Sequence, residues 1–351
     1  MPAAPASPLL ALPGLLFGGI VRARNALYSA GYLRQERLSR PVISIGNLTL
    51  GGTGKTPFAV FVADLLCRLG AVPALLSRGY GRRSDSDLLV LSPGETVEQA
   101  TLVLGDEPAL VRRKVPAIWV GISRDRCAAG LQILEKGCLP IFILDDGFQH
   151  RKLYRDLDVL ILDATQPLEA NRVIPGGSLR EPVIGLRRAH VIVINESFSR
   201  NRNEQLREVV RKLHPEIQVC NCTQRVDSFV PISDWLRSPG GGREARVSGP
   251  VYLVAAVGNT ERFRLSIESM GLEVKGCRFF RDHYALSKRE WDECGREAFR
   301  SGADILITTE KDAIKLDHAP DLPLFVALQS TRLEQSADFE QMIRSMLEGA
   351  E

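Results

Sequence analysis

The sequence predicts an α/β protein: a doubly wound parallel sheet followed by a second, smaller α/β domain. Short apolar runs, among them 42–45, 141–144 and 191–194, alternate with helical stretches, a pattern typical of parallel strands joined by helices. A glycine-rich loop separates the first run from a helical stretch. A Gly/Pro-rich segment at 238–250 precedes further apolar runs that begin at Tyr252, which indicates a second unit.

Length and composition narrow the function classes. At 351 residues the chain is long enough for two domains that each bury a core. Hydrophobic residues make up 44% and charged residues 25%, which is ordinary for a soluble α/β protein. A net charge of +3, without a basic stripe carrying aromatic residues, argues against a nucleic-acid-binding protein. The seven cysteines include no C-x-x-C pair, so we expect free thiols in a reducing cytosol.

The N-terminal segment 8–21 is apolar and uncharged. As a helix it would be about 20 Å long, short of the roughly 30 Å hydrocarbon core of a bilayer. Its positive charges, beginning with Arg22 and Arg24, follow the apolar run, whereas a secretory signal carries them in front. We therefore expect an interfacial membrane anchor, with a helix packed on the protein core as the alternative.

A nucleotide-binding loop is the strongest local signal. The predicted strand Val42–Ile45 leads into Gly51-Gly52-Thr53-Gly54, then Lys55 and Thr56, and then a helix. Glycines let backbone N–H groups approach a phosphate, and the helix N-terminus adds partial positive charge. Lys55 would reach the β- and γ-phosphates and Thr56 would ligate Mg²⁺. Thr49 stands where the usual P-loop pattern has glycine, so a turn without a ligand is the alternative.

A pair of carboxylates is the second signal. The apolar strand 141–144 ends in Asp145-Asp146. In P-loop proteins an acidic residue at the end of a neighbouring strand helps to hold Mg²⁺. Two adjacent carboxylates repel each other unless a cation compensates them, so we predict that this pair serves a metal.

Other candidates lie in loops. Spacing alone favours Asp106 as a helix N-cap, and Tyr80 lies in a basic turn suited to anions or sugars or simply to solvent. Arg180, beside Glu181, is a candidate phosphate sensor, and a surface ion pair is the alternative. His283, between Asp282 and Tyr284, is a catalytic candidate because it would face a nucleotide site. The charged run 310–312 has no assignment from spacing.

From these signals we expect four segments. They are an apolar and basic membrane-associating helix at 1–40, a P-loop domain at 41–225, a linker at 226–249 and a smaller α/β domain at 250–351 that completes the cleft.

Taken in order, the motifs resemble those of the tetraacyldisaccharide 4′-kinase family of Gram-negative bacteria. The matching stretches between residues 44 and 315 are SIGNLTLGGTGKTP, SRGYGR, GDEP, DDGFQHR, PGGSLREP, DHY and TTEKDAIK. GGTGKTP alone is generic, whereas GDEP, DDGFQH and GSLREP in sequence are specific to the family. Thr49 is not a departure from this family, whose loop resembles this one.

The resemblance implies a fold, an activity and a location. The enzyme would transfer the γ-phosphate of ATP, with Mg²⁺, to the 4′-hydroxyl of a tetraacylated glucosamine disaccharide 1-phosphate. Because four acyl chains keep this lipid A precursor in the bilayer, the enzyme would associate peripherally or monotopically with the cytoplasmic face of the inner membrane. No nucleic acid and no obligate protein partner are expected.

The resemblance also implies residue roles. Asp106 and His283 would form a catalytic dyad in which Asp106 accepts the hydroxyl proton, and this replaces the N-cap interpretation. Arg180 would stabilise charge on the transferring phosphoryl group. The remaining roles are these: phosphate binding by Thr49, Leu50, Gly51, Gly52, Thr53, Gly54, Lys55 and Thr56; metal binding by Thr56, Asp145 and Asp146; and second-rank contacts by Tyr80, Arg126, Gln149, His150 and Glu181. Arg124 competes with Arg126 for the arginine position of the family, and we favour Arg126.

A rival class shares part of this signature. A P-loop switch or metallochaperone-like NTPase, which hydrolyses nucleotide and phosphorylates nothing, would also carry the loop and Asp145-Asp146. The membrane-seeking N-terminus and the GDEP and DHY motifs favour the kinase.

Overall fold

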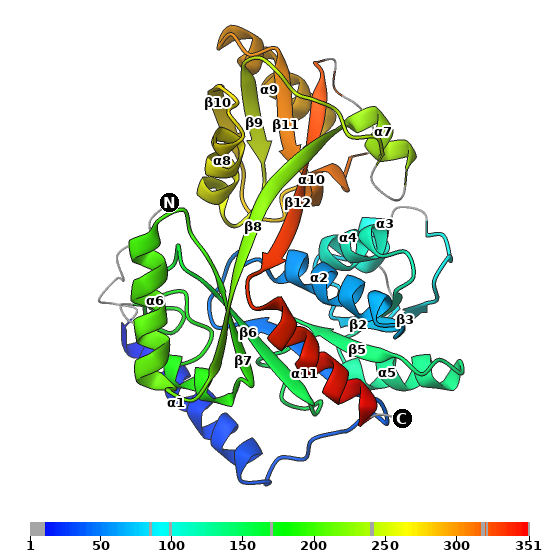
Figure 1. Cartoon of the computed structure of the whole chain (residues 1–351), viewed down its shortest axis with the longest axis vertical. Coiled ribbons are helices and arrows are strands. Elements are labelled where there is room, and N and C mark those ends of the chain that lie inside the picture. Colours follow the sequence, from blue (N-terminus) through cyan, green and yellow to red (C-terminus); the bar gives the residue numbers. More distant parts are fainter. Residues whose placement is uncertain are drawn as a thin grey trace.

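A single mixed sheet runs through two lobes of the molecule (Figure 1). The computed structural model describes residues 11–83, 86–97, 100–168, 171–238, 242–316, 320 and 322–349. Within these ranges the α/β fold with a mostly parallel sheet is confirmed, and the twelve strands that they contain belong to one sheet. The larger lobe carries the first seven strands, and the smaller lobe carries β9, β10 and β11.

The elements have the following bounds. The strands are β1 (Val42–Asn47), β2 (Pro73–Ser77), β3 (Leu88–Leu91), β4 (Trp119–Ser123), β5 (Ile141–Asp145), β6 (Leu157–Asp163), β7 (Val191–Asn195), β8 (Gln218–Pro231), β9 (Val251–Ala255), β10 (Val274–Phe279), β11 (Ile305–Thr309) and β12 (Leu324–Leu333). The helices are α1 (Ala11–Ser29), α2 (Lys55–Arg68), α3 (Ala100–Leu104), α4 (Asp106–Lys114), α5 (Arg126–Glu135), the 3-10 helix η2 (Val183–Arg188), α6 (Arg200–Leu213), α7 (Ile232–Arg237), α8 (Thr260–Ser269), α9 (Lys288–Arg300), α10 (Glu310–Ala313) and α11 (Ser336–Glu348).

The strand order indicates the edge of the sheet at which a ligand would bind. The order is β10-β9-β11-β12-β8-β7-β6-β1-β5-β2-β4-β3, and the antiparallel pairs are β8 with β12 and β3 with β4. Strand β1 lies between β5 and β6, where the chain first winds to one side and later to the other. Ligands of open α/β sheets bind at such a switch point, beyond the carboxyl ends of the strands.

Apolar residues explain why these elements form and pack. Every residue of β1, β5, β6 and β7 is buried, as expected for strands covered on both faces. Helices α2, α4 and α11 bury apolar residues in one core of the larger lobe, whereas α5 and α6 pack in separate cores with other strand residues. In the smaller lobe, α8 and α9 likewise belong to different cores.

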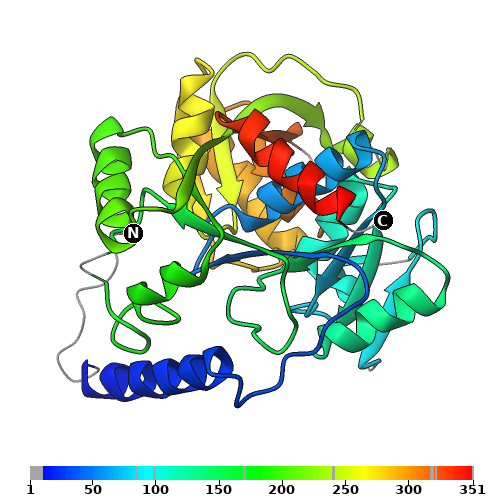
Figure 2. The ribbon, with the colours of Figure 1, turned by 60° about the horizontal axis from the view of Figure 1, so that its bottom comes forward.

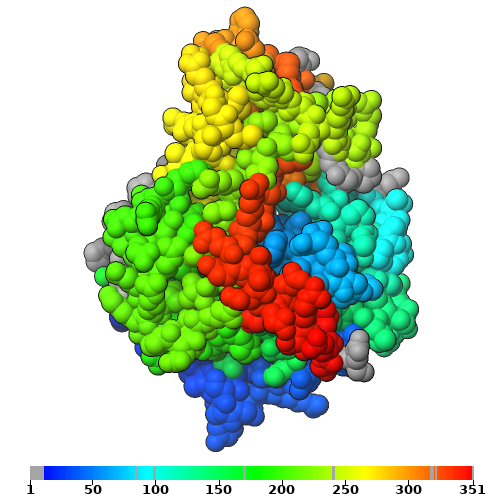
Figure 3. Space-filling view, viewed as in Figure 1, coloured from blue at the N-terminus to red at the C-terminus, as the bar shows by residue number. Residues whose placement is uncertain are grey.

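Two long strands and the last helix join the lobes. Strands β8 and β12 pair along nine register positions and pass from one lobe to the other (Figure 1). Helix α11 then returns to the larger lobe, where Phe339 packs against Phe58 and Phe61 of α2. The space-filling view shows this C-terminal helix lying across the larger lobe (Figure 3). The C-terminal part of the chain therefore contributes to both lobes.

The predicted linker at 226–249 differs from what the structure contains there. Residues 226–231 are the end of β8, and Ile232–Arg237 form α7, whose Trp235 is buried in the small-lobe core. Residues 239–241 of the glycine-rich run lie outside the described residues. The sequence did not predict β8 because its polar, outward-facing positions alternate with buried ones and leave no continuous apolar run. The division into domains at 41–225 and 250–351 remains a prediction.

Helix α1 lies along the outside of the larger lobe, at the bottom of Figure 2. It extends well past the apolar segment predicted at 8–21, whose first residues lie outside the described ranges. Leu12, Leu15, Leu16 and Ile20 are each about two-thirds exposed, whereas Val21 is buried. Among the described helices, none has the length and apolarity needed to cross a bilayer.

Candidate active site

A cavity of about 1680 Å³ opens between the two lobes at the carboxyl ends of the central strands. The loop after β1, the end of β5 and the start of α2 line one side of it. The turn at 281–284, the start of α10 and the inner part of β12 line the small-lobe side. Phe17, Val21 and Arg24 of α1 also reach the cavity wall.

The loop from Leu50 to Thr56 has the geometry of an anion cradle. Gly54 is the N-cap of α2 and has a φ of 91°, a conformation that favours glycine. A Cβ at Gly54 would also collide with the side chains of Gln224 and Asn195. On the small-lobe side, Gly258 lies so close to Gly52 that a Cβ on either glycine would crowd the backbone of the other.

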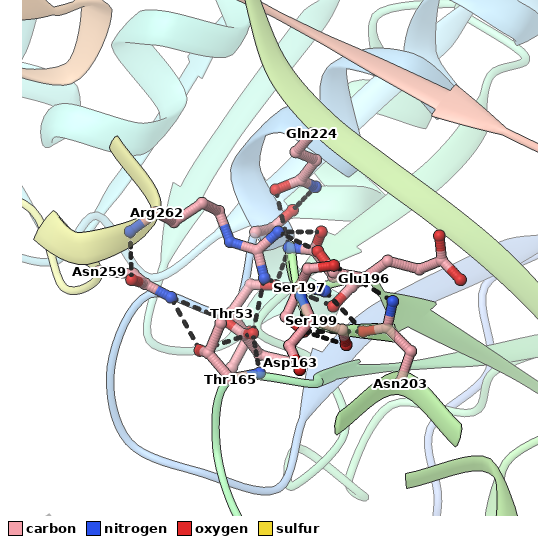
Figure 4. A network of polar contacts seen from close by, with 12 residues as sticks. Thr53, Asp163, Thr165, Glu196, Ser197, Ser199, Asn203, Gln224, Asn259 and Arg262 are labelled. Carbon is pink, nitrogen blue, oxygen red and sulfur yellow. Dashed lines mark hydrogen bonds and ion pairs between the residues drawn. The ribbon is translucent and has the colours of Figure 1, made fainter. Parts of the chain in front are cut away.

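A buried polar network holds this loop from behind (Figure 4). The Asn195 amide donates to the Thr53 carbonyl at 3.0 Å, and the Gln224 amide donates to the Gly54 carbonyl at 2.8 Å. Asn195 ends β7 and Gln224 lies on β8, so the larger-lobe sheet itself fixes the backbone of the loop.

Arg262 of α8 fixes the same network from the small lobe. Its guanidinium donates to Asp163 Oδ1 at 2.6 Å, to Asn195 Oδ1 at 2.9 Å and to the Glu196 carbonyl at 2.6 Å. Both side chains of the Arg262–Asp163 ion pair are buried. The pair therefore ties the small lobe to the strand ends directly behind the phosphate-binding loop.

Asp146 gathers two cations at the floor of the cavity. Arg180 donates to its Oδ2 at 2.6 Å, and Lys55 Nζ lies 3.4 Å from its Oδ1. Burial raises the pKa of Asp146, but Lys55 and Arg180 outweigh burial and leave it below the ordinary value. Asp146 and His283 are the described non-glycine residues with positive φ, and such strain concentrates at functional sites.

Asp145 has the opposite electrostatic environment. It accepts a hydrogen bond from Ser77 Oγ at 3.1 Å, and its side chain is buried. Burial, followed by the charges of Glu107 and Asp146, raises the pKa of Asp145 to about 6. The two neighbouring carboxyls therefore differ, because the cations of the site contact Asp146.

His283 and Asp106 meet across the cleft. His283 Nδ1 lies 3.1 Å from Asp106 Oδ2, and Tyr80 packs against the imidazole. Lys311 Nζ lies 3.2 Å from His283 Nε2. Glu107 Oε1 lies 3.3 Å from the same nitrogen. Because the ionised Asp106 carboxylate only accepts, His283 Nδ1 carries a proton and donates it to Asp106. Burial raises the Asp106 pKa, but the hydrogen bond from His283 and the charge of Lys315 bring it below the ordinary value.

Comparison with known sequences identifies the family of the chain. A family model described as LpxK, tetraacyldisaccharide-1-P 4′-kinase, matches residues 6–348. The chain belongs to this family. A tetraacyldisaccharide 4′-kinase of Desulfotalea psychrophila is 34% identical over 336 residues, which is 93% of each chain. One of Anaeromyxobacter sp. strain Fw109-5 is 39% identical over 318 residues, or 90% of this chain and 85% of the relative.

A solved structure agrees over nearly the whole chain. The crystal structure of LpxK from Aquifex aeolicus in complex with ATP superposes with a TM-score of 0.72 at 31% sequence identity. The match covers 95% of this chain and 98% of that one. The fold described above is therefore that of the tetraacyldisaccharide 4′-kinase family.

The structure brings most of the predicted kinase residues to one cavity. Residues 50–56, Tyr80, Arg126, Asp145, Asp146, Gln149, His150, Arg180 and His283 line it. Arg126 contacts His150 Nδ1 at 3.2 Å, whereas Arg124 is exposed, which favours Arg126 over Arg124. Burial, then the charges of Arg126 and Arg155, lowers the pKa of His150 to about 4, so His150 is neutral beside these arginines.

Three predicted residues have positions or contacts that differ from the expectation. Gly105, not Asp106, is the N-cap of α4, which corrects the interpretation from spacing. Thr49 is buried behind the loop, and its carbonyl accepts from the Asn47 side chain. Glu181 pairs with Arg188, not with Arg180, and accepts a hydrogen bond from Gln149. It therefore supports a cavity residue from beneath.

Sequence reasoning missed the residues that position the loop 50–56 and the Asp106 carboxylate. Arg262 and Asn195 had no motif, and Lys315 lies at the end of TTEKDAIK, whose charges had no assigned role. One signal was available for Asn195 and Asp163: each directly ends a buried strand, as Asp145 does. For Arg262 no comparable signal exists, because it lies within an ordinary charged helix.

We predict that Arg262→Met strongly destabilises the protein. The substitution leaves the buried Asp163 carboxylate without its cation, which typically costs about 3–5 kcal/mol. Arg264→Met on the same helix is the matched control, because the Arg264–Glu268 pair is exposed and its loss should cost well under 1 kcal/mol. Urea unfolding measures both. Arg262→Met/Asp163→Asn should recover much of the loss, and equal effects of the two arginine variants would contradict the assignment.

Asp145 should make the metal-free protein less stable as pH rises. Its folded-state pKa of about 6 lies above the unfolded value near 4, so the folded state binds more protons between these pH values. Stability from this group is therefore present below about pH 4 and lost by about pH 6. Relative to wild type, Asp145→Asn should gain roughly 2–3 kcal/mol between pH 4 and pH 7.

Unfolding in chelator across this pH range tests the expectation. Asp64→Asn, at an exposed ion pair on α2, is the control and should show no such trend. An Asp145→Asn advantage that stays constant or shrinks with rising pH would rule out the raised pKa.

Proposed function

We propose that this chain transfers the γ-phosphate of ATP to the 4′-hydroxyl of a tetraacyldisaccharide 1-phosphate, a lipid A precursor. The observation that carries the proposal is that His283, Lys55 and Asp146 line one cavity, with Asp106 in contact with His283 at 3.1 Å. A hydroxyl-activating dyad and a phosphate cradle in one space suit phosphoryl transfer to an alcohol. The family of the chain agrees with this activity.

ATP fits the loop side of the cavity. The backbone of residues 50–54 and the N-terminus of α2 suit the phosphates, and Lys55 lies beside them. The related LpxK structure contains ATP, which supports nucleotide binding by the same fold.

The acidic floor of the cavity suits Mg²⁺. Asp146 Oδ1 is buried and has no hydrogen-bond partner beyond the ion-pair contact with Lys55 Nζ at 3.4 Å, and the pKa of Asp145 is raised by burial and then by neighbouring acids. Thr56, Asp145 and Asp146 would hold the ion, and the nucleotide phosphates would complete its shell. In the described part of the chain no cluster of three or more His, Cys, Asp or Glu residues could hold a metal, which agrees with a site that depends on the nucleotide. When bound, the ion neutralises charge on the β- and γ-phosphates.

The residues of the chain divide the reaction between them. Asp106 accepts the proton of the 4′-hydroxyl while the sugar oxygen forms a bond to the γ-phosphorus. The bond from the γ-phosphorus to the bridging oxygen breaks, and ADP leaves. Lys55 and Arg180, both on Asp146, are placed to meet the charge of the transferring group. Tyr80, Arg126, Gln149 and His150 line the wall where the disaccharide would enter.

Helix α1 is suited to bring the enzyme to its lipid. Its exposed leucines and Ile20 form an apolar surface, and Arg22 and Arg34 beside it are also exposed. Phe17 and Val21 of the same helix reach the cavity wall. We therefore place the enzyme peripherally on the cytoplasmic face of the inner membrane, with the acyl chains leaving the cavity along α1.

The switch NTPase is the weaker alternative. It shares the loop and Asp145-Asp146 but gives no role to a histidine–aspartate pair opposite the phosphates. Release of free phosphate without a labelled lipid would favour it.

Transfer of labelled γ-phosphate from ATP to a tetraacyldisaccharide 1-phosphate in detergent micelles is the direct test. Wild type should label the lipid, and Asp106→Ala should lower turnover by about 10²–10⁴-fold because the base is lost. His283→Ala should lower kcat far more than it changes the KM for ATP. An unlabelled lipid with the wild-type protein would overturn the proposal.

The membrane assignment has its own test. Replacing Leu12, Leu15, Leu16 and Ile20 with serine should greatly reduce sedimentation with vesicles containing phosphatidylglycerol, because the exposed apolar surface of α1 is removed. Turnover in detergent micelles should fall much less. Leu131→Ser/Leu139→Ser, at exposed leucines elsewhere, is the control. Unchanged vesicle binding by the α1 variant would exclude α1 as the anchor.

A further inference from the structure

The lysines of the segment 308–315 lie beside the proposed base. Lys315, which follows α10 in the small lobe, places its Nζ 3.3 Å from Asp106 Oδ2, the same oxygen that His283 contacts. Among the described residues, both side chains that contact the Asp106 carboxylate, His283 and Lys315, do so at Oδ2. Oδ1 is left to meet a hydroxyl group.

Lys315 is held in this position by its other contacts. Its ammonium group also lies 3.3 Å from the Tyr284 carbonyl and 3.4 Å from Asp312 Oδ1, so three acceptors match its three N–H donors. Asp312 is fixed in turn by the Ala256 amide at 2.9 Å and by Thr309 Oγ1 at 2.7 Å. Both side chains of the Lys315–Asp312 pair are buried. A buried cation with every donor used has little freedom to move.

We propose that Lys315 is a positioning residue that holds Asp106 through Oδ2, so that Oδ1 meets the acceptor hydroxyl in the phosphoryl transfer. The inference rests on the proposed kinase function and gives a role to the TTEKDAIK stretch. Through this segment, the position of the small lobe determines how the Asp106 carboxylate on α4 is held. When the lobes lie as in this structure, His283 and Lys315 together fix one carboxylate oxygen.

A neighbouring lysine allows a matched comparison. Lys114 of α4 also bridges the lobes, through Glu310 at 2.8 Å and the Gln329 carbonyl at 3.2 Å, and it does not contact Asp106. Losing Lys114 removes an interlobe ion pair of the same segment. Losing Lys315 removes such a pair and also the hold on the base.

A double-mutant cycle with Asp106→Asn tests the inference by single-turnover transfer from labelled ATP. Lys315→Met should lower the transfer rate about 100-fold in the wild-type background, as expected for a displaced catalytic group, with the KM for ATP within about twofold. In the Asp106→Asn background it should lower the rate less than threefold, because the base it positions is already gone. Lys114→Met should have the same relative effect in both backgrounds.

Folding is checked separately. Lys315→Met leaves Asp312 without its cation, so Lys315→Met/Asp312→Asn, which removes that charge too, is measured in parallel and unfolded in urea. A stable double variant with the same rate loss supports positioning. An unchanged rate, or a loss of equal size with and without Asp106, would overturn the inference. If wild type labels no acceptor at all, the proposed function fails instead.

Discussion

The pairing of β8 with β12 is the constraint on which the site depends. These strands carry one sheet through both lobes, and their register matches residues about 100 positions apart, such as Val226 with Gln329. Gln224 on β8 holds the Gly54 carbonyl, and Gln329 on β12 donates its N–H to Glu310 at the start of α10. A single strand pair therefore positions both the loop 50–56 and the segment 308–315, which faces Asp106.

Ion pairs cross the cleft in both directions, since Lys114 of the larger lobe pairs with Glu310 of the small lobe. The larger lobe contributes the acids Asp106, Glu107, Asp145 and Asp146. The small lobe contributes Lys311 and Lys315, which neutralise Glu107 and Asp106 across the cleft. Lys55 and Arg180, from the larger lobe, are both engaged by Asp146. Asp145 forms no ion pair with these cations, and burial, followed by the charges of Glu107 and Asp146, raises its pKa.

The sequence predicts the strands that are buried on both faces, because continuous apolar runs such as 42–45 and 141–144 are visible without structural context. It also predicts the chemistry-bearing loops that follow these strands. It does not predict β8, whose alternating burial resembles a loop when the partner strand is unknown. The roles of Arg262 and Lys315 are not predicted for a related reason. Their importance comes from acceptors far away in the chain, Asp163 and Asp106, and no local pattern records such a distance.

The ion pairs between the lobes differ in how a movement of the lobes would affect them. Arg262–Asp163 lies behind the loop, in a network that the sheet edge already holds, so it acts as a fixed point. Lys311–Glu107 lines the cleft, where nucleotide and acceptor would enter, and Lys315–Asp106 lies beside it in contact with His283. If the lobes moved apart about the fixed point, the cleft pairs would separate first. Asp106 and Glu107 would then lose these cations, and Asp106 would lose the two contacts, with His283 and Lys315, that lower its pKa. The contacts of His283 and Lys315 with Asp106, the proposed base, thus require the small lobe to lie against α4, so in the proposed reaction proton acceptance would depend on the relative position of the two lobes.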